Sequence, residues 1–170
     1  MRHAVEKRSI RVKSQPAKKE RGRQTVVLSD LFEIEVPARS ENLGRARQAV
    51  ASVAESLHLT AEDTCDLLLA VGEACNNAVQ HGSGSTNGAL QVRCRLRSKS
   101  HRPQSLQVEI ANTGNGFLPK KNDPIFSMPK AQDFAGHGRG LPLMHRLMDD
   151  VQIFCENGNT VVRLTKRISG

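Results

Sequence analysis

The spacing of hydrophobic positions changes along the chain and predicts where strands and helices lie. Apolar residues alternate toward the end of the segment Val26–Val36, which indicates a strand that ends at Pro37. After that proline the apolar residues recur at helical spacing, so Ser40–Asn42 is expected to open a first helix. The apolar face of this helix comprises Leu43, Ala46, Val50, Val53, Ala54 and Leu57.

A second helix is predicted to start at Thr60. The Thr60 hydroxyl can cap the helix, while Asp63, at the third helical position, reaches back. The helical pattern continues to His81, and Gly82 is a typical helix stop. Its apolar positions include Leu67, Leu68, Val71, Cys75 and Val79.

The segment Leu90–Leu96 alternates between apolar and polar side chains, which is the pattern of a half-buried strand. Because its polar positions are mostly arginine, we expect a basic face toward solvent. The polar stretch Ser98–Gln104 is expected to be a connector. It leads to a partner strand marked by Leu106, Val108 and Ile110.

After this partner strand, an irregular segment is predicted to about Gly136. A helix is then expected from about Gly138 to Met148, followed by a hairpin of Val151–Cys155 and Thr160–Lys166. Strands that are adjacent in sequence favour antiparallel pairs with helices over one face. The predicted fold class is α+β, a two-layer sandwich of a mixed, mostly antiparallel sheet covered on one face by helices.

The positive charge of the chain is concentrated at its N-terminus. Nine of the 25 Lys and Arg residues lie in residues 1–24, which hold two of the 17 acidic residues. The remaining chain has 16 basic and 15 acidic groups, which disfavours a nucleic-acid-binding globule. We therefore expect a basic, disordered arm over 1–24 and a folded domain over 25–170, with nucleic-acid contact left open for the arm alone.

Residue types exclude several other classes of protein. The chain has no Trp or Tyr and only five Phe, so it lacks the aromatic platforms of single-strand binders. No apolar run approaches the roughly 20 residues of a membrane helix, and the N-terminus lacks a secretory signal. The cysteines show no C-x-x-C spacing of the kind typical of metal sites. They are therefore expected to be reduced core residues of a cytoplasmic protein; they are Cys65, Cys75, Cys94 and Cys155.

Glu73 and Asn77 are the first candidates for chemistry. They lie four residues apart on the second predicted helix, so they share one face. A carboxylate beside an amide carbonyl can hold a hard cation and orient an attacking hydroxyl. By itself the pair also fits an exposed polar face.

Two glycine-rich segments are the other candidates. Asn112–Gly116 directly follows a predicted strand, where its glycines would permit either a close ligand or a tight turn. Gly136–Leu141 opens a predicted helix, whose free N–H groups and Arg139 could meet phosphate oxygens. Its glycine spacing differs from G-x-G-x-x-G, and no strand precedes it directly, so a dinucleotide-binding fold does not fit.

In combination, these clusters make residues from about 30 to 167 resemble the ATP-binding domain shared by gyrase-type topoisomerases, heat-shock chaperones, histidine kinases and mismatch-repair proteins (the GHKL family, with its Bergerat-type fold). The chain resembles most closely the anti-sigma-factor serine kinase branch. The helix motif E-x-x-x-N-A-x-x-H is matched by Glu73, Asn77, Ala78 and His81. The glycine boxes and closing strand are matched by Gly114, Gly116, Gly136, Gly138, Gly140, Leu141, Gly158 and Thr160.

The resemblance implies roles for these residues. Glu73 would be the general base for a serine hydroxyl, Asn77 would coordinate Mg²⁺ at the phosphates of ATP, and His81 would be a structural cap. The first glycine box would lie close to adenine and ribose, the second box with its arginine would close on the phosphates, and the threonine would support adenine. The implied nucleotide-binding residues are Asn77, Asn112, Gly114, Gly116, Gly136, Gly138, Arg139, Gly140 and Thr160.

The sequence departs from the family pattern at Asn112, where the first glycine box normally begins with an aspartate that accepts a hydrogen bond from the adenine amino group. An amide oxygen can accept the same bond without charge. Since charge-assisted bonds are roughly twice as strong as neutral ones, about 1 kcal/mol of adenine affinity would be lost. On this argument, Asn112→Asp would bind nucleotide more tightly.

The leading hypothesis is an ATP- and Mg²⁺-dependent protein serine/threonine kinase of the anti-sigma-factor type. It would phosphorylate a small antagonist protein on serine, hold a sigma factor in its other state, and resemble relatives that tend to form homodimers. The alternative, favoured by Asn112, is a non-enzymatic partner-binding module with weak or no nucleotide binding. A histidine-kinase fragment is disfavoured, because no helical hairpin with a phospho-acceptor histidine precedes the domain.

Overall fold

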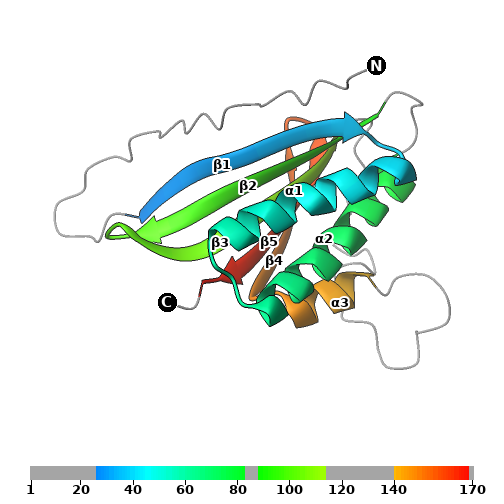
Figure 1. Ribbon diagram of the computed structural model, residues 1–170. Helices are drawn as coiled ribbons and strands as arrows, with labels where there is room; N and C mark the ends of the chain where they lie inside the picture. The colour runs from blue at the N-terminus through cyan, green and yellow to red at the C-terminus, as the bar shows by residue number, and fades with distance from the viewer. Residues whose placement is uncertain (1–25, 83–87, 114–139, 169–170) are drawn as a thin grey trace, which may run out of the picture.

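The computed structural model describes residues 26–82, 88–113 and 140–168, which form a five-stranded sheet with three α-helices on one face (Figure 1). This confirms the predicted two-layer α+β sandwich. All pairings in the described sheet are antiparallel. In chain order the elements are β1 (Val26–Pro37), a short 3₁₀ helix (Ser40–Asn42), α1 (Leu43–Ser56), α2 (Ala61–Gly82), β2 (Ala89–Lys99), β3 (Arg102–Thr113), α3 (Gly140–Leu147), β4 (Asp150–Glu156) and β5 (Asn159–Arg167).

The order of strands across the sheet is β1-β2-β3-β5-β4, so β3 lies at its centre. After β3 the chain passes through α3 to the edge strand β4, and β5 then returns between β3 and β4. Ala111 pairs with Val161, and Asn112 is the next residue of β3. The end of the central strand is thus placed beneath the helical layer, beside the start of β5.

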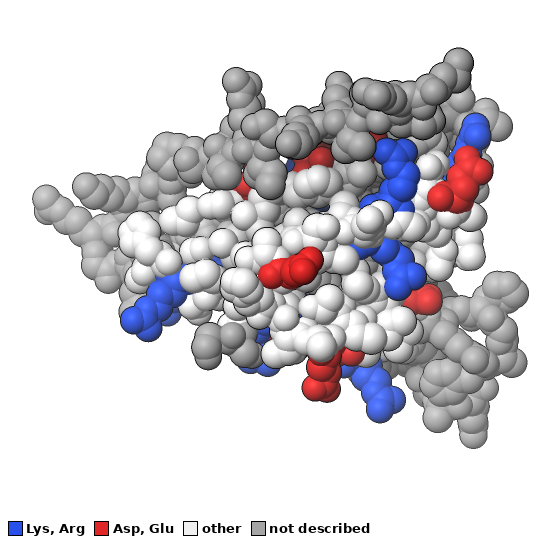
Figure 2. Space-filling model, viewed as in Figure 1, with Lys and Arg blue, Asp and Glu red and all other residues white. Residues whose placement is uncertain are grey.

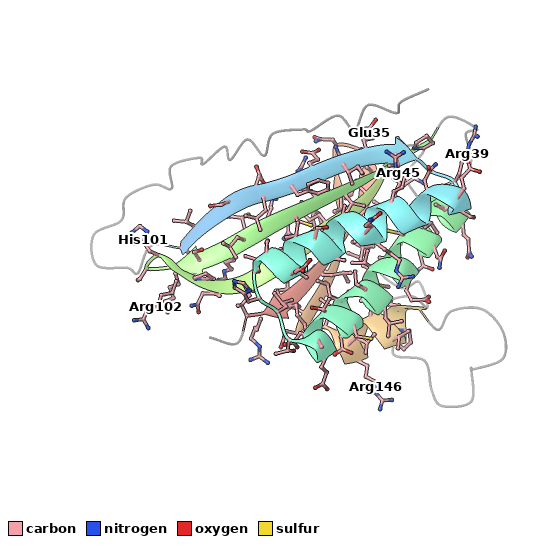
Figure 3. All side chains as sticks on the ribbon, in the orientation of Figure 1. Glu35, Arg39, Arg45, His101, Arg102 and Arg146 are labelled. Carbon is pink, nitrogen blue, oxygen red and sulfur yellow. The ribbon has the colours of Figure 1, made fainter. Side chains whose placement is uncertain are left out.

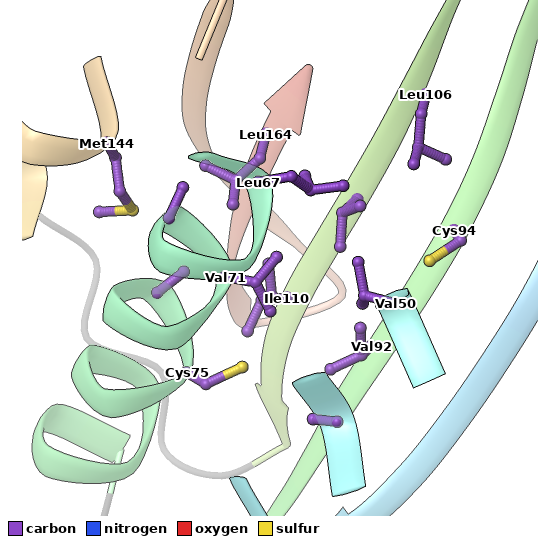
Figure 4. Close-up of a cluster of buried hydrophobic side chains, with 14 of the residues drawn as sticks. Val50, Leu67, Val71, Cys75, Val92, Cys94, Leu106, Ile110, Met144 and Leu164 are labelled. Atoms are coloured by element: carbon purple, nitrogen blue, oxygen red, sulfur yellow. The ribbon is translucent and has the colours of Figure 1, made fainter. Parts of the chain in front are cut away.

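The core lies between the sheet and the helices (Figure 4). The inward positions of each strand are apolar because side chains alternate between the two faces. Each helix buries one stripe, and alanines in the α1 and α2 stripes let these helices pack close to the sheet. Fully buried members include Ala46, Val50, Ala54, Leu67, Ala70, Val71, Ala74, Cys75, Leu90, Val92, Leu106, Val108 and Leu164.

Both predicted helix starts are confirmed. The Asp63 backbone N–H donates to Thr60 Oγ1 at 3.0 Å, and the Thr60 hydroxyl donates to Asp63 Oδ2 at 2.8 Å. This reciprocal cap satisfies one of the free N–H groups in the first turn of α2. The first helix opens as the 3₁₀ turn Ser40–Asn42 before α1 begins at Leu43.

The predicted connector over Ser98–Gln104 is wrong. The strands β2 and β3 continue through most of it and turn at Ser100 and His101, whose φ values are 50° and 64°. Positive φ at two central residues matches the twist of a hairpin, but serine and histidine give no glycine or Asn-Gly signal for it. His101 and Arg102 form the tip of this hairpin, far from α3 (Figure 3). The predicted turn of the last hairpin is confirmed at Asn157 and Gly158, with φ values of 52° and 80°.

The predicted basic solvent face of β2 is neutralised in part, because two of its three arginines, Arg93 and Arg95, form ion pairs. Glu109 of β3, with a 5% exposed side chain, lies among three guanidinium groups. Arg163 approaches it at 2.7 Å, Arg95 at 3.2 Å and Arg93 at 3.8 Å. Arg93 and Arg95 also pair with acidic residues of β1. Sequence alternation gave the face of each residue but not the partners that neighbouring strands supply.

The cysteine prediction is confirmed for Cys75 and Cys94, which are buried free thiols; burial raises the pKa of each to about 12. It is wrong for Cys65 and Cys155, which are free but exposed.

The helical face of the domain carries few charged side chains (Figure 2). Among the described helices, none is both long enough and apolar enough to cross a membrane.

Candidate functional site

Helix α2 carries the first two predicted site residues on the edge of its buried face. Its sheet-facing stripe continues through Val71, Ala74 and Cys75, all buried. Glu73 and Asn77, one turn apart, are half-buried beside this stripe. The helix therefore places a carboxylate and an amide side by side where the core meets solvent.

The start of α3 lies directly against these two side chains. Gly140, the first residue of α3, is buried, and a Cβ at this position would lie 2.9 Å from Glu73 Oε2 and 3.2 Å from Asn77 Nδ2. A side chain at this position would require Glu73 and Asn77 to move from the positions that they occupy. Gly140, the one glycine of the second glycine box that the structure describes, therefore lies against the carboxylate and the amide predicted from the first motif.

Asn112 joins the same region from the sheet. It is 6% exposed, and its Nδ2 donates a hydrogen bond to the Ala78 carbonyl oxygen at 2.6 Å. Its Oδ1 is buried, and none of the residues that the structure describes donates a hydrogen bond to it. Because Ala78 follows Asn77 on α2, this bond ties the end of β3 to the helix that carries Glu73 and Asn77.

The remaining predicted site residues are described only in part. Thr160, half-buried, lies near the start of β5 opposite Cys155 of β4. The His81 backbone belongs to the last turn of α2, but its side chain lies outside the description. Also outside the described residues are Gly114, Gly116, Gly136, Gly138 and Arg139.

The sequence analysis missed the residue that anchors the opposite end of α2. Lys166 of β5 places its Nζ 3.1 Å from Asp63 Oδ1, 3.1 Å from Asp66 Oδ2 and 3.0 Å from the Leu147 carbonyl oxygen. Lys166 thereby connects the start of α2 to the end of α3. One signal was available, since strand parity puts Lys166 on the same face as Leu164.

The donor atoms at this site fit a hard cation held together with phosphate groups. Glu73 and Asn77 offer carboxylate and amide oxygens, which suit Mg²⁺. Within the part of the chain that the structure describes, no three His, Cys, Asp or Glu side chains form a metal site. One or two protein oxygens match the usual binding of Mg²⁺ with nucleotide, in which phosphates and water supply the other ligands.

The chain belongs to the histidine kinase-like ATPase domain family, whose model matches residues 36–166. This stretch contains every site residue from Glu73 to Thr160. The resemblance to the GHKL family is therefore confirmed, and the described sheet and helices belong to a histidine kinase-like ATPase domain.

The relatives in sequence confirm the serine kinase branch. A Bacillus velezensis protein named serine-protein kinase RsbW is 34% identical over 146 residues, covering 83% of this chain and 88% of its own. The Bacillus subtilis protein of the same name is 33% identical over 147 residues, covering 84% and 88%. The prediction of a protein serine/threonine kinase agrees with these names.

The fold is also found in a solved structure, that of the RsbU and RsbW domains of a Mycobacterium tuberculosis protein. The match has a TM-score of 0.55 at 18% identity and covers 82% of this chain. The chain spans 33% of that longer protein. This likeness concerns the fold alone.

Proposed function

We propose that this chain is an ATP- and Mg²⁺-dependent protein serine kinase that also binds a sigma factor. The observation that carries the proposal is the meeting of three separate motifs. Gly140 of α3 lies against Glu73 and Asn77 of α2, and Asn112 of β3 is hydrogen-bonded to Ala78, the next residue of that helix. If Glu73 and Asn77 were only part of a solvated polar helix face, the other two motifs would not be expected to pack against them.

In this mechanism the chain positions groups for an in-line phosphoryl transfer. The serine hydroxyl of a partner attacks the γ-phosphorus of ATP, the bond to the bridging oxygen breaks, and ADP leaves. Glu73 accepts the hydroxyl proton as general base. Asn77 and the start of α3 hold the polyphosphate end of the nucleotide. Mg²⁺, when bound, neutralises charge that develops on the phosphate oxygens.

The partner assignment follows from the resemblance to the anti-sigma-factor serine kinases, and the relatives' name supports serine as the phosphorylated residue. The phosphate acceptor would be a small antagonist protein, and the partner in the other state would be a sigma factor, both in the cytoplasm. A homodimer is compatible with this activity. The basic segment 1–24 leaves nucleic acid as a partner of that segment alone.

The proposal is tested first by nucleotide binding and then by phosphate transfer. Ligand at about 100 times its dissociation constant stabilises a protein by about 2.7 kcal/mol, which raises Tm by several degrees at this size. Mg-ATP should raise the Tm of the wild type, and Asn77→Ala should abolish that shift. Glu73→Gln should keep the shift but lower acid-stable serine phosphorylation of an antagonist protein about 10²- to 10⁴-fold.

Asn76→Ala is the matched control, because Asn76 is the neighbouring asparagine on α2 and is exposed. It should keep both the Tm shift and the phosphate transfer. The absence of any Mg-ATP shift in the wild type would contradict the kinase proposal. That result would support the alternative of a non-enzymatic partner-binding module. This alternative is favoured by Asn112, which stands where the family pattern has an aspartate.

A further inference from the structure

Lys166 is a charged residue at an inward position of β5. It pairs with Leu106 of β3, whose side chain is fully buried, so both side chains point to the helical side of the sheet. Lys166 is 8% exposed, and a buried ammonium group is stable only where acceptors replace water. The Asp63 and Asp66 carboxylates and the Leu147 carbonyl oxygen lie 3.0 to 3.1 Å from its Nζ. Each of the three donors of the ammonium group therefore has an acceptor.

These acceptors belong to opposite ends of two helices. Asp63 and Asp66 lie near the start of α2, and Leu147 is the last residue of α3. Negative charge is favourable at the start of a helix and positive charge at its end, so the arrangement suits both helix dipoles. Burial by itself would lower the pKa of Lys166, but the bonds to the two aspartates raise it above its usual value. Lys166 thus stays charged and joins the two helix ends.

The same two helices also meet at the candidate site. Helix α3 lies beside α2 and runs antiparallel to it, with Gly140 against Glu73 and its last residue near the start of α2 (Figure 1). Leu147 is seven residues after Gly140, and Glu73 is seven residues after Asp66. Both stretches therefore have the same length of about 10 Å. A shift of α3 along α2 would change the contact at Glu73 and the contact at Lys166 together.

The end of α3 is also tied to β5 by Asp149. The Asp149 N–H donates to the Thr165 carbonyl oxygen at 3.0 Å, and the Arg167 N–H donates to Asp149 Oδ2 at 2.7 Å. These bonds make the end of α3 and β5 one unit. Lys166, which lies between Thr165 and Arg167 on the opposite face of β5, connects that unit to α2.

We propose that Lys166 is a positioning residue for phosphoryl transfer, which fixes α3 along α2 and thereby holds Gly140 against Glu73. This inference rests on the proposed function, in that Glu73 is the general base. Lys166 acts through α3, from about two helical turns away. A displacement of about 1 Å at a reacting group can lower a rate about 100-fold, so a small shift of α3 is sufficient to matter.

The experiment is a double-mutant cycle with four full-length proteins: wild type, Lys166→Met, Gly140→Ala and the double variant. The rate of phosphate transfer from saturating Mg-ATP to serine of an antagonist protein reports the site. Amide hydrogen exchange in α3 without nucleotide reports the position of the helix. Arg167→Met is the control, because it removes the neighbouring cation and its exposed ion pair with Asp149 without touching α2.

We expect Lys166→Met to speed amide exchange in α3 and to slow phosphate transfer about tenfold. Gly140→Ala should slow transfer about 10- to 100-fold in wild type but less than about threefold in Lys166→Met, because a shifted α3 no longer presses the added methyl group against Glu73. If Lys166 contributed stability alone, the two effects would multiply. Arg167→Met should match wild type in transfer and in exchange within about twofold.

Multiplying effects in the cycle, or equal exchange in α3 for Lys166→Met and Arg167→Met, would overturn the inference. Asp66→Asn serves as a second variant if Lys166→Met does not fold, since it removes one charge and keeps the ammonium group. It should speed exchange in α3 and slow transfer about twofold or more, and wild-type values of both would overturn the inference as well.

A wild type that transfers no phosphate would contradict the proposed function. In that case the exchange measurement decides by itself whether Lys166 fixes α3, because it requires neither nucleotide nor a partner protein.

Discussion

At the residue scale, one missing side chain determines how closely two of the predicted site motifs meet. Gly140 lies so near Glu73 and Asn77 that a Cβ would touch both. The atoms it would meet belong to the end of the Glu73 side chain and the amide of Asn77. Since a long side chain can rotate away at small cost, an added methyl group would disturb the chemistry more than the fold.

Gly140→Ala is therefore expected to lower phosphate transfer to a serine partner about 10- to 100-fold, because Glu73, the proposed general base, is displaced from its position. Circular dichroism and Tm should show that the domain still folds. Gly44→Ala is the control: no atom lies within 4 Å of a Cβ there, and the change should stabilise α1 by about 0.5–1 kcal/mol. Full activity of Gly140→Ala would show that the contact with Glu73 has no catalytic importance.

At the scale of elements, α2 is held near both of its ends. Near its start, the ion pairs of Lys166 with Asp63 and Asp66 fix it to β5, and the hydrogen bond from Lys166 to Leu147 links both to the end of α3. Near its end, Asn112 fixes it to β3. Glu73 and Asn77 lie between these anchors, so the polar pair is carried by a helix that cannot slide along the sheet.

The Thr60 cap also makes part of the stability depend on pH. The hydrogen bond from the Thr60 hydroxyl, followed by that from Lys166, holds the pKa of Asp63 below its usual value. A lowered folded-state pKa means that the stabilisation is complete above about pH 4, the pKa of an unfolded aspartate, and is lost as the pH falls through the folded-state value.

Thr60→Ala should accordingly lower the free energy of unfolding at neutral pH by about 1 kcal/mol. The difference from wild type should narrow as the pH falls below about 4, because protonated Asp63 no longer accepts the charged bond. Urea denaturation at a series of pH values measures both effects. Thr64→Ala, one turn into the same helix, should change stability by less than about 0.5 kcal/mol. An equal loss in both variants would contradict the role of the cap.

At the scale of the whole molecule, the core and the positive charge occupy different parts of the chain. The buried hydrophobic residues of the described structure lie between Val36 and Leu164. Residues 1–24 hold nine basic residues and two acidic ones, which gives them most of the net charge of +8. The stability of the domain should therefore not depend on this segment.

Deletion of residues 1–24 is expected to change Tm by less than about 2 °C, because the free energy of unfolding should change by less than about 0.5 kcal/mol. Differential scanning calorimetry of the full chain and the shortened chain tests this. Nucleotide binding by the shortened chain should equal that of the full chain. A fall in Tm of many degrees would show that the segment packs on the domain and that the predicted boundary is wrong.

The sequence by itself determined the order of elements, the caps and the candidate residues. Alternation at Leu90–Leu96, the Thr60–Asp63 cap and the Asn157-Gly158 turn are local, because each depends on neighbours within a few residues. Glu73 and Asn77 could be placed on one face for the same reason. The turn at Ser100 and His101 escaped prediction because its residue types lack the usual signal.

Only the tertiary structure decided how these pieces meet. No spacing in the sequence indicates that Gly140 contacts Glu73. Nor does any spacing indicate that Lys166 pairs with two aspartates of α2, or that Glu109 lies among three arginines. The clearest case is Asn112. From the sequence it was expected to be a weaker acceptor than the aspartate of the family pattern, whereas in the fold its amide nitrogen donates a hydrogen bond to α2. The partners of such groups come from distant segments, and packing against the shared core brings them into contact.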